Sequence, residues 1–534
     1  MTQIQVRLQS KSWKKLSEAN DITWCERGTL TDGAAALKSA ETPVEYVNAL
    51  SQVNGFFAVV KKGRNGLFAA VDHIRSIPLY YVESKNGFLI SDDAEWLREE
   101  INANEITRVA RDEFQLAGYV SGHDTLYDGI RQLQAGEYIQ VSQDENQRLE
   151  IEVARYFRFL PSGVENTDET TCEKNRLDNV VDECVNRLIE YAAGRQIVVP
   201  LSGGYDSRLI LIKLKQLGYK NILAFTYGRP GNKDSKYSKE IAGALGVAWV
   251  YVPYTAAAWR SAGSSSEFRW YQYTASGLNS VAHVQDWLAV RELKNKSVIK
   301  KDCVFVPGHG AMAVFSHLKD VSEEFDREDI AEWLLKKKYN FAPPDVMSQE
   351  LHNKIITNID GILSYTASPI SVITCWEWQE RQAKYLVNSV RAYEFFEFDW
   401  WMPLWDRSFV EFWNKAPIEI RKNKDWYINY VIWVSGTEAE REIPKDNAKD
   451  VKKIRMSVYR WMLKENIFQG LVINMLRSVF RGRGQLSFEG IIGARRFSAL
   501  TQRGYRLIGM LALDFIKDID LYRDEAVKGS RRCA

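Results

Sequence analysis

The stretch VVPLSGGYDSRLILIKLKQLG, from Val198 to Gly218, sets a short apolar run against two adjacent glycines and then a helical pattern. The run VVPL is typical of a buried strand, and the apolar positions that follow Asp206 have the spacing of a helix. A strand that passes through two glycines into a helix exposes backbone N–H groups at the helix N-terminus, which favours an anion such as phosphate. The stretch therefore predicts an anion-binding turn at the end of a buried strand.

The chain around this turn alternates between strand and helix patterns. Helices are expected at 172–193, 206–217 and 236–245, and strands at 196–201, 221–227, 248–252 and 303–306. Strands that alternate with helices at this spacing form βαβ units, so the sequence predicts a parallel sheet. Ligands of open parallel sheets bind at the carboxyl ends of the strands, where the two glycines lie.

The first 160 residues have a different pattern. Short β-prone runs, at Gly55–Lys62, Gly66–Asp72, Pro78–Ser84 and Gly87–Asp93, are separated by turn signals and indicate antiparallel hairpins. A polar, turn-rich linker follows near 161–171. We therefore expect three parts: an N-terminal domain at 1–160, an α/β domain at 172–434 and a mostly helical extension at 435–534.

The composition of the chain restricts the kinds of partner that we expect it to bind. The 71 basic and 69 acidic residues nearly cancel, which gives no reason to expect nucleic acid or a membrane surface as the main partner. The N-terminus has no apolar signal segment, and the apolar run at Leu507–Ile516 is too short to span a bilayer and contains an acid. Because the six cysteines show no CxxC pair, we expect reduced thiols in a cytoplasmic protein without a membrane span.

The chemistry of the turn is suited to a nucleotide. Ser202 adds a hydroxyl donor, and Gly203 and Gly204 let the backbone approach a ligand closely. Asp206, at the start of the helix, caps the helix and is also a suitable oxygen ligand for the magnesium ion of a polyphosphate. A capped turn without any ligand is the alternative.

Longer stretches carry a resemblance to a known family. The string SGGYDS resembles the SGGxDS signature of the N-type ATP pyrophosphatases, and other segments resemble one branch of them, the asparagine synthetases. These segments are AFTYGRPGNKDSKYSKEIAGALGVAWVYVPYT at Ala224–Thr255, DHIRSIPLYY at Asp72–Tyr81, VNSVRAYEFFEFDWWMPLWDRSFVEFW at Val387–Trp413 and KNKDWYINYV at Lys422–Val431. The resemblance covers most of residues 50–430.

The resemblance implies a fold and an activity. The fold would be an N-terminal αββα glutaminase-like sandwich joined to a parallel α/β domain of the adenine nucleotide α-hydrolase type with helical additions. The activity would be amide formation from ATP and a carboxylate, through an acyl-adenylate that ammonia or an amine attacks. ATP and Mg²⁺ would be required, because magnesium and lysine offset the charge of the triphosphate.

The resemblance also implies the residues of the site. ATP would be bound by Leu201, Ser202, Gly203, Gly204, Asp206, Ser207, Thr226, Tyr227, Gly228, Pro307 and Gly308, with Asp206 as the metal ligand. Lys424 would contact pyrophosphate, with Lys422 and Arg421 as rivals. Glu394 would act as a general base together with a tyrosine, either Tyr393 or Tyr365.

The sequence departs from the family pattern at the glutaminase site. Family members that hydrolyse glutamine use an N-terminal cysteine, but residue 2 is Thr2 and the glycine-rich segment that should follow is missing. Cys25 lies inside the chain and has no free amine. We therefore expect a retained domain without glutaminase activity, with the amine supplied as free ammonia, by a second substrate or by a partner protein; a homodimer is also open.

A second departure concerns the metal. The family's third ATP-site motif reads SGEGSDE, whereas this chain has Ala311, Met312 and Ala313 in place of Ser-Asp-Glu. A thioether cannot replace a carboxylate for a hard cation. Asp234 or Asp320 could substitute, or the protein could be a catalytically impaired nucleotide-binding or regulatory protein of the same fold.

Other features stay open. The carboxylate substrate could be aspartate, a sugar uronate or a peptide carboxylate. His283, His309 and His317 lack the spacing of a zinc site and are expected to be structural. The basic stretch at 477–484 is expected to be solvated, with a flexible loop over the site as the alternative.

Overall fold

The computed structural model describes residues 3–17, 22–63, 66–84, 87–144, 148–161, 170–315, 318–422, 424–436 and 486–533. Thr2, His317, the expected linker between 162 and 169 and the basic stretch at 477–484 lie outside these residues.

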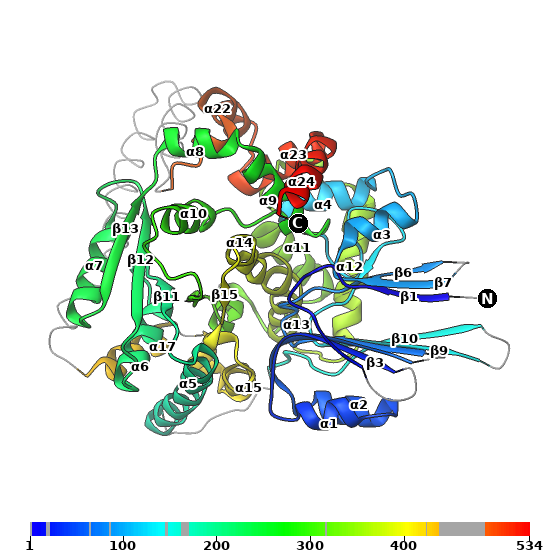
Figure 1. Cartoon of the computed structure of the whole chain (residues 1–534), viewed down its shortest axis with the longest axis horizontal. Helices are drawn as coiled ribbons and strands as arrows, with labels where there is room; N and C mark the ends of the chain where they lie inside the picture. The colour runs from blue at the N-terminus through cyan, green and yellow to red at the C-terminus, as the bar shows by residue number, and fades with distance from the viewer. Residues whose placement is uncertain are drawn as a thin grey trace.

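Two stacked sheets form the N-terminal part (Figure 1). The larger has the order β10-β9-β5-β4-β3-β2 and is antiparallel throughout. Its strands are β2 (Lys14–Ser17), β3 (Thr23–Thr31), β4 (Asn54–Lys62), β5 (Gly66–Val71), β9 (Glu137–Gln143) and β10 (Leu149–Arg155). The smaller has the order β1-β7-β6-β8, with β1 (Gln3–Arg7), β6 (Tyr80–Ser84), β7 (Gly87–Ser91) and β8 (Arg131–Gln132).

Helices cover both outer faces of this pair of sheets. Helices α1 (Ala34–Ser39) and α2 (Pro43–Leu50) lie under the larger sheet, and α3 (Ala94–Glu100) and α4 (Arg108–Ala117) lie over the smaller one (Figure 1). Strand β4 is buried on both faces: Phe57 and Val59 pack in the cluster with Leu50, while Ala58 and Val60 face the main core. The αββα sandwich expected from the sequence is confirmed.

The second part is a five-stranded parallel sheet with the order β13-β12-β11-β14-β15. Its strands are β11 (Ile197–Pro200), β12 (Ile222–Gly228), β13 (Ala248–Pro253), β14 (Val304–Phe305) and β15 (Asp399–Trp400). The chain leaves β11 toward β12 and β13, then returns to the other side of β11 as β14. The strand order thus reverses between β11 and β14, and ligands of open α/β sheets bind at such a switch point.

Helices surround this sheet. They include α5 (Thr170–Ala192), α6 (Asp206–Gln216), α7 (Lys233–Ala244), α8 (Ala256–Gly263), α9 (Ser266–Ser276) and α10 (Trp287–Asn295). Helix α7 begins at Lys233, before the expected 236, because the Asn232 side chain accepts from the Ser235 N–H and caps the helix. The expected parallel α/β fold is confirmed.

The next helical segment lies beyond β14. It contains α11 (Arg327–Lys338), α12 (Gln349–Leu363), α13 (Pro369–Trp376), a π-helix at Glu377–Leu386, α14 (Arg391–Phe395), α15 (Arg407–Lys415), α16 (Ile418–Lys422) and α17 (Lys424–Ser435). Short 3-10 turns connect them: η1 (Ala311–Phe315), η2 (Leu318–Asp320), η3 (Pro344–Val346), η5 (Val387–Val390) and η6 (Pro403–Trp405).

The C-terminal helices return to the first two parts. They are α21 (Glu489–Ile492), α22 (Ala494–Gln502), α23 (Leu507–Lys517) and α24 (Ile519–Cys533). Helix α21 packs on α8, α23 on α4 and α24 on α9 (Figure 1). Among the described residues, none of the helices combines the length and apolarity that crossing a bilayer requires.

Candidate functional site

The loop after β11 is a compact turn held by its own side chains. The Thr226 hydroxyl donates to the Leu201 carbonyl at 2.5 Å and fixes the exit from the strand. In the loop, the Gly204 N–H donates to Ser202 Oγ at 3.1 Å, and the Ser202 N–H donates to Ser207 Oγ at 3.4 Å. The N-cap residue Tyr205 makes no side-chain hydrogen bond to the start of α6, which lies next to the exposed Ser202 and Gly204. This arrangement suits an anion.

The loop after β14 lies against the first loop. A methyl group on Gly308 would come within 2.7 Å of the Ser207 nitrogen, and one on Gly310 would come within 2.3 Å of Leu404 Cβ. Glycine is therefore required by close packing at both positions. Since Pro307 precedes Gly308, the structure brings the two predicted glycine segments together at the switch point.

Met312 follows these glycines in η1 and carries no charge. Its side chain is half-buried and packs against the main core.

Asp206 follows the first loop directly, as the first residue of α6. Burial raises the pKa of its carboxyl, while the hydroxyl of Tyr427 and the charge of Lys424 act in the opposite direction. Lys424 itself is exposed at the first turn of α17. A carboxylate with a raised pKa gains most from an added cation, because desolvation penalises its charged form.

Asp234 and Asp320 were considered as substitutes for the carboxylate that Met312 replaces, and their surroundings differ. A Cβ on Gly203 would lie 3.1 Å from Asp234 Oδ1, so the Asp234 carboxylate faces the loop after β11. Asp234 also lines the cavity described below. Asp320, in η2, forms an ion pair of 2.7 Å with Lys337 on α11. The geometry favours Asp234.

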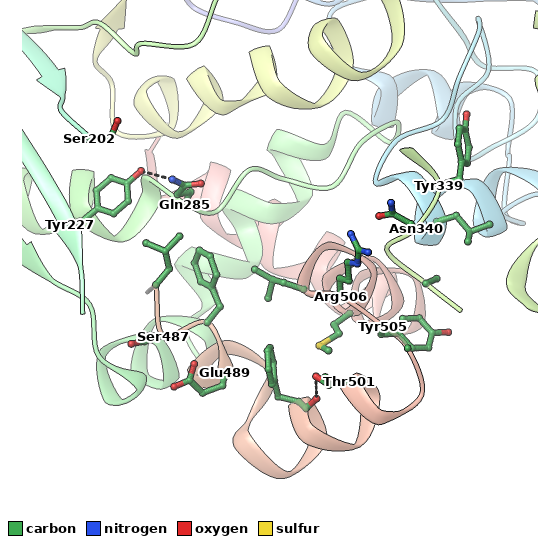
Figure 2. Close-up of a pocket in the computed structure, with 18 of the residues that line it drawn as sticks. Ser202, Tyr227, Gln285, Tyr339, Asn340, Ser487, Glu489, Thr501, Tyr505 and Arg506 are labelled. Atoms are coloured by element: carbon green, nitrogen blue, oxygen red, sulfur yellow. Dashed lines mark hydrogen bonds between the residues drawn. The ribbon is translucent and has the colours of Figure 1, made fainter. Parts of the chain in front are cut away.

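Strand β12 forms the side of the site where the adenine of ATP was expected to bind. Thr226 is buried, and the Tyr227 ring stacks on Tyr254 with 4.8 Å between centroids and an interplanar angle of 10°. Gln285 donates to the Tyr227 hydroxyl at 3.0 Å, as Figure 2 shows. Gly228 has a φ of 133°, and its carbonyl accepts from the Tyr251 hydroxyl at 2.5 Å.

A cavity of about 1160 Å³ opens beside these strand ends. Of the predicted site residues, Leu201, Ser202, Thr226 and Tyr227 line it; the remaining ones are not part of its wall. Much of the rest of the wall comes from the end of α11 with the segment that follows it, and from the C-terminal segment between Leu486 and Met510. In Figure 2, Ser202 and Tyr227 lie on one side of the space, and Tyr339 and Tyr505 lie on the other.

Glu394 lies in a cluster of ion pairs. Its carboxylate pairs with Arg391 at 2.5 Å and with Arg27 of β3 at 3.0 Å, and it accepts from Trp400 Nε1 at 2.9 Å. Burial acts to raise the pKa of Glu394, but the two arginines and Trp400 together hold it below its ordinary value. The contact joins the two main parts of the chain, and the general-base role of Glu394 stays a prediction.

Burial lowers the pKa of His309 and of His283. Burial lowers the pKa of His309 to about 3, with a smaller contribution from His283, and its Nε2 lies 2.9 Å from Ser389 Oγ. His283 lines a second cavity of about 210 Å³ that shares Gln285, Phe488, Arg506 and Leu507 with the first. Within the described ranges, no group of three His, Cys, Asp or Glu side chains is arranged to hold a metal.

Cys25 is the thiol nearest to the N-terminus in the described part of the chain. It lies half-buried on β3, and burial raises its pKa, with Lys15 acting in the opposite direction. A thiol with a raised pKa is a poor nucleophile at neutral pH.

Several residues of the cavity were missed by sequence reasoning. Lys336 and Tyr339 of the helical region, and Phe488 and Arg506 of the C-terminal segment, all line it. The only sequence signal in this region was the apolar run at 507–516, and an apolar run does not reveal which part of the chain it packs against.

Comparison with known proteins identifies two family models. The model described as asparagine synthase matches residues 176–501, and that described as glutamine amidotransferase domain matches residues 42–156. No curated protein matches the chain.

Solved structures give only distant likenesses. The allosteric regulatory enzyme of purine biosynthesis is 10% identical, with 45% of this chain and 62% of that chain covered and a TM-score of 0.19. NMN synthetase from Francisella tularensis is 13% identical over 39% of this chain and 92% of that one, with a TM-score of 0.21. Glutamine-dependent NAD⁺ synthetase from Acinetobacter baumannii, in complex with ADP, is 10% identical over 63% and 78%, with a TM-score of 0.17. These scores assign neither a fold nor an activity.

Proposed function

Since the chain belongs to the asparagine synthase family, we propose that it is an ATP-dependent ligase that activates a carboxylate as an acyl-adenylate and forms an amide from it. One observation supports this most strongly: the loops after β11 and β14, far apart in sequence, pack together at the switch point. The uncapped start of α6, Asp206 and Lys424 surround the same point. The arrangement suits a triphosphate beside a second substrate.

The chain's residues have distinct roles in this proposal. Phosphate oxygens are held by the N–H groups and hydroxyls of Ser202, Gly203, Gly204 and Ser207. Pro307 and Gly308 support these residues from the neighbouring loop after β14. Leu201, Thr226, Tyr227 and Gly228 form the adenine side, where backbone atoms of β12 hold the base. Lys424 stabilises the departing pyrophosphate by its charge.

The acids near the loop fit a magnesium ion. Asp206 has the raised pKa of a carboxylate that is poorly compensated, and Asp234 faces the same glycine turn. Oxygen ligands of this kind are those that Mg²⁺ takes, together with water and phosphate oxygens. When bound, the ion neutralises phosphate charge. Asp206 and Asp234 would hold it, without the acid that Met312 replaces.

The amine comes from outside this chain in our proposal. Cys25 has a raised pKa and no free amine beside it, so it does not supply an N-terminal cysteine nucleophile. Free ammonia, an amine on a second substrate or ammonia from a partner protein would then attack the adenylate. The N-terminal sandwich would serve as a scaffold that packs against the ligase part.

A second candidate is a nucleotide-binding protein of the same fold that does not catalyse. Met312 favours it, because the loss of one charged ligand near a triphosphate removes stabilisation of the developing pyrophosphate.

Pyrophosphate exchange separates the two candidates. Purified protein is incubated with ATP, Mg²⁺, labelled pyrophosphate and single acids: aspartate, glucuronate or a peptide with a free carboxylate. Exchange that depends on an acid and disappears in Asp206→Ala supports the ligase. ATP binding without exchange for any acid supports the non-catalytic protein, and absence of ATP binding overturns both.

A glutaminase assay tests the source of the amine. We expect no release of glutamate from glutamine by the wild-type protein. Release that is lost in Thr2→Ala, with unchanged pyrophosphate exchange, would contradict the proposed scaffold role.

A further inference from the structure

The cavity has room for more than a nucleotide. Its volume of about 1160 Å³ exceeds the roughly 300–1,000 Å³ that is common for a site with one small ligand. The strand ends and the glycine loop account for one side of it. The C-terminal segment and α11 enclose the other side, where a second molecule would lie.

The far wall offers apolar contact. Phe488, Phe497, Leu507 and Met510 line it. Its polar groups are largely engaged within the protein: the Tyr505 hydroxyl donates to Gln115 Oε1 at 3.3 Å, and the Tyr339 hydroxyl donates to Glu113 Oε1 at 2.9 Å.

Two further hydroxyls of this wall are also engaged. Thr501 donates to the Phe497 carbonyl at 2.8 Å, and Ser487 donates to the Tyr254 carbonyl at 3.1 Å. With these four hydroxyls engaged within the protein, the aromatic and aliphatic side chains of this wall favour a ligand with an apolar body.

Arg506 adds a positive charge to this apolar wall. It lines both cavities, and Figure 2 shows its guanidinium directed into the space on the side of Asn340. None of the carboxylates in the described stretches of the chain pairs with it. Glu489, the acid on the same wall, pairs instead with Arg229. Arg506 is also exposed, so a ligand in the cavity can reach it.

The backbone at Arg506 is fixed in place. Its N–H donates to the Phe341 carbonyl at 2.9 Å. A methyl group on Gly509, in the next turn, would come within 2.1 Å of that same carbonyl, so α23 lies directly against the segment after α11. This packing fixes the backbone of Arg506 at the cavity wall.

We propose that the acid substrate has an apolar body and carries, besides the carboxylate that is activated, a second anionic group that binds Arg506. This inference rests on the proposed function for the identity of the ligand as the substrate. Arginine binds carboxylate, sulfonate and phosphate groups through paired N–H donors, and such charge-assisted bonds are stronger than those between neutral groups. Arg506 would therefore select among acids by the group they carry at the far end.

Two fluorescent probes test this site without ATP. 8-Anilinonaphthalene-1-sulfonate has an apolar aromatic body and a sulfonate, and N-phenyl-1-naphthylamine has the same body without the charge. We expect Arg506→Gln to weaken binding of the sulfonate by about tenfold or more. Binding of the neutral probe should not change.

Arg503→Gln is the matched control. Arg503 lies three residues away, is exposed, and is not part of the cavity wall. Equal sulfonate affinity in Arg506→Gln and wild type, or an equal loss in Arg503→Gln, would overturn the proposal. Thermal unfolding of each variant checks that it folds.

Nucleotide binding is measured separately with a fluorescent ATP analogue. Its failure in the wild type would count against the ligase, whereas the sulfonate comparison would still decide whether Arg506 forms an anion site.

Discussion

Gly308 lies directly against Ser207, so that a methyl group at residue 308 would come within 2.7 Å of the Ser207 backbone nitrogen. The contact joins the loop after β14 to the first turn of α6. Because Ser207 Oγ also accepts from the Ser202 N–H, a displacement of Ser207 would reach the phosphate-binding loop.

Gly308→Ala should therefore weaken nucleotide binding by at least about tenfold and lower the free energy of unfolding by about 1–3 kcal/mol, the usual cost of overpacking. Isothermal titration with ATP and Mg²⁺ measures the first effect, and denaturant unfolding measures the second. Gly361→Ala is the control, because a methyl group there meets nothing within 4 Å. Equal ATP affinity in the two variants would contradict the packing argument.

Asp206 should destabilise the nucleotide-free protein at neutral pH. Its pKa is raised by burial, so the folded state holds the proton more tightly than the unfolded state does. Stability then falls as pH rises from the ordinary aspartate pKa, about 3.9, through the raised value. Asp206→Asn should remove this fall and unfold at a higher temperature than wild type at pH 7.

The same variant should lose its response to nucleotide. ATP and Mg²⁺ at about 100 times the dissociation constant stabilise a protein by about 2.7 kcal/mol, and Asp206→Asn should show little of this shift. Thermal unfolding between about pH 3 and 8, with and without ATP, tests both statements. Asp524→Asn, an exposed position on α24, is the control. A nucleotide shift of wild-type size in Asp206→Asn would rule out its role toward the metal.

Many elements of the fold were predictable because they depend on local patterns. The apolar runs and glycine turns of β4 to β7 predicted those strands to within a few residues, and the switch from a strand to a helix at Asp206 was found directly. The start of α7 was placed too late because the capping bond from Asn232 was not considered. Local signals thus determine the type of an element better than its first residue.

The second half of the cavity could not be predicted from the sequence. Phe488 and Arg506 face Ser202 across the cavity, although about three hundred residues of chain separate them. No local pattern encodes which surface the apolar side of α23 covers. The ion pair between Arg27 and Glu394 was missed for the same reason, since its two residues come from different parts of the chain.

Asp234 and Asp320 form a natural pair of test positions. Asp234 faces Gly203, whereas Asp320 is engaged with Lys337. Asp234→Asn should raise the Mg²⁺ concentration that supports half-maximal ATP binding by several-fold, because one oxygen ligand loses its charge. Asp320→Asn should leave it unchanged. A titration of Mg²⁺ at fixed ATP decides the matter, and a larger effect at Asp320 would reverse the assignment.

Glu394→Gln should lower stability more than it affects adenylation. The variant removes the carboxylate that pairs with Arg391 and Arg27, while Arg27 keeps a longer contact of 3.5 Å with Asp92, and this loss should cost about 1–3 kcal/mol at pH 7. Because the pKa of Glu394 is held low, this contribution is present above the ordinary glutamate pKa of about 4.3 and is lost as pH falls through the folded value. The difference between variant and wild type should therefore shrink in acid.

Glu397→Gln is the control for this position, since Glu397 is exposed and its ion pair with Lys294 spans 3.4 Å. Urea unfolding at pH 7 and at about pH 2, below the ordinary glutamate pKa, measures the stabilities. Pyrophosphate exchange should persist in Glu394→Gln, because no amine takes part in that half-reaction. Loss of amide formation with retained exchange would assign Glu394 the role of base; unchanged stability would contradict the ion-pair argument.

Met312→Asp should restore the acid that the metal site lacks. Met312 is half-buried and packs on the core, so an aspartate there loses hydration and should lower stability without metal by about 1–3 kcal/mol. With ATP and Mg²⁺ present, a second carboxylate near Asp206 would be attracted to the ion, and part of the lost stability should return. The gain on adding ATP and Mg²⁺ should therefore be larger in this variant than in wild type.

Met312→Asn separates charge from polarity at that position, because it has the same shape as aspartate and no charge. It should lose stability without metal, but it should gain no more than wild type when ATP and Mg²⁺ are added. Thermal unfolding and Mg²⁺ titration of both variants measure the difference. Equal metal responses in Met312→Asp and Met312→Asn would mean that residue 312 lies outside the reach of the ion, and that Asp206 and Asp234 make up the protein's whole charge at the metal.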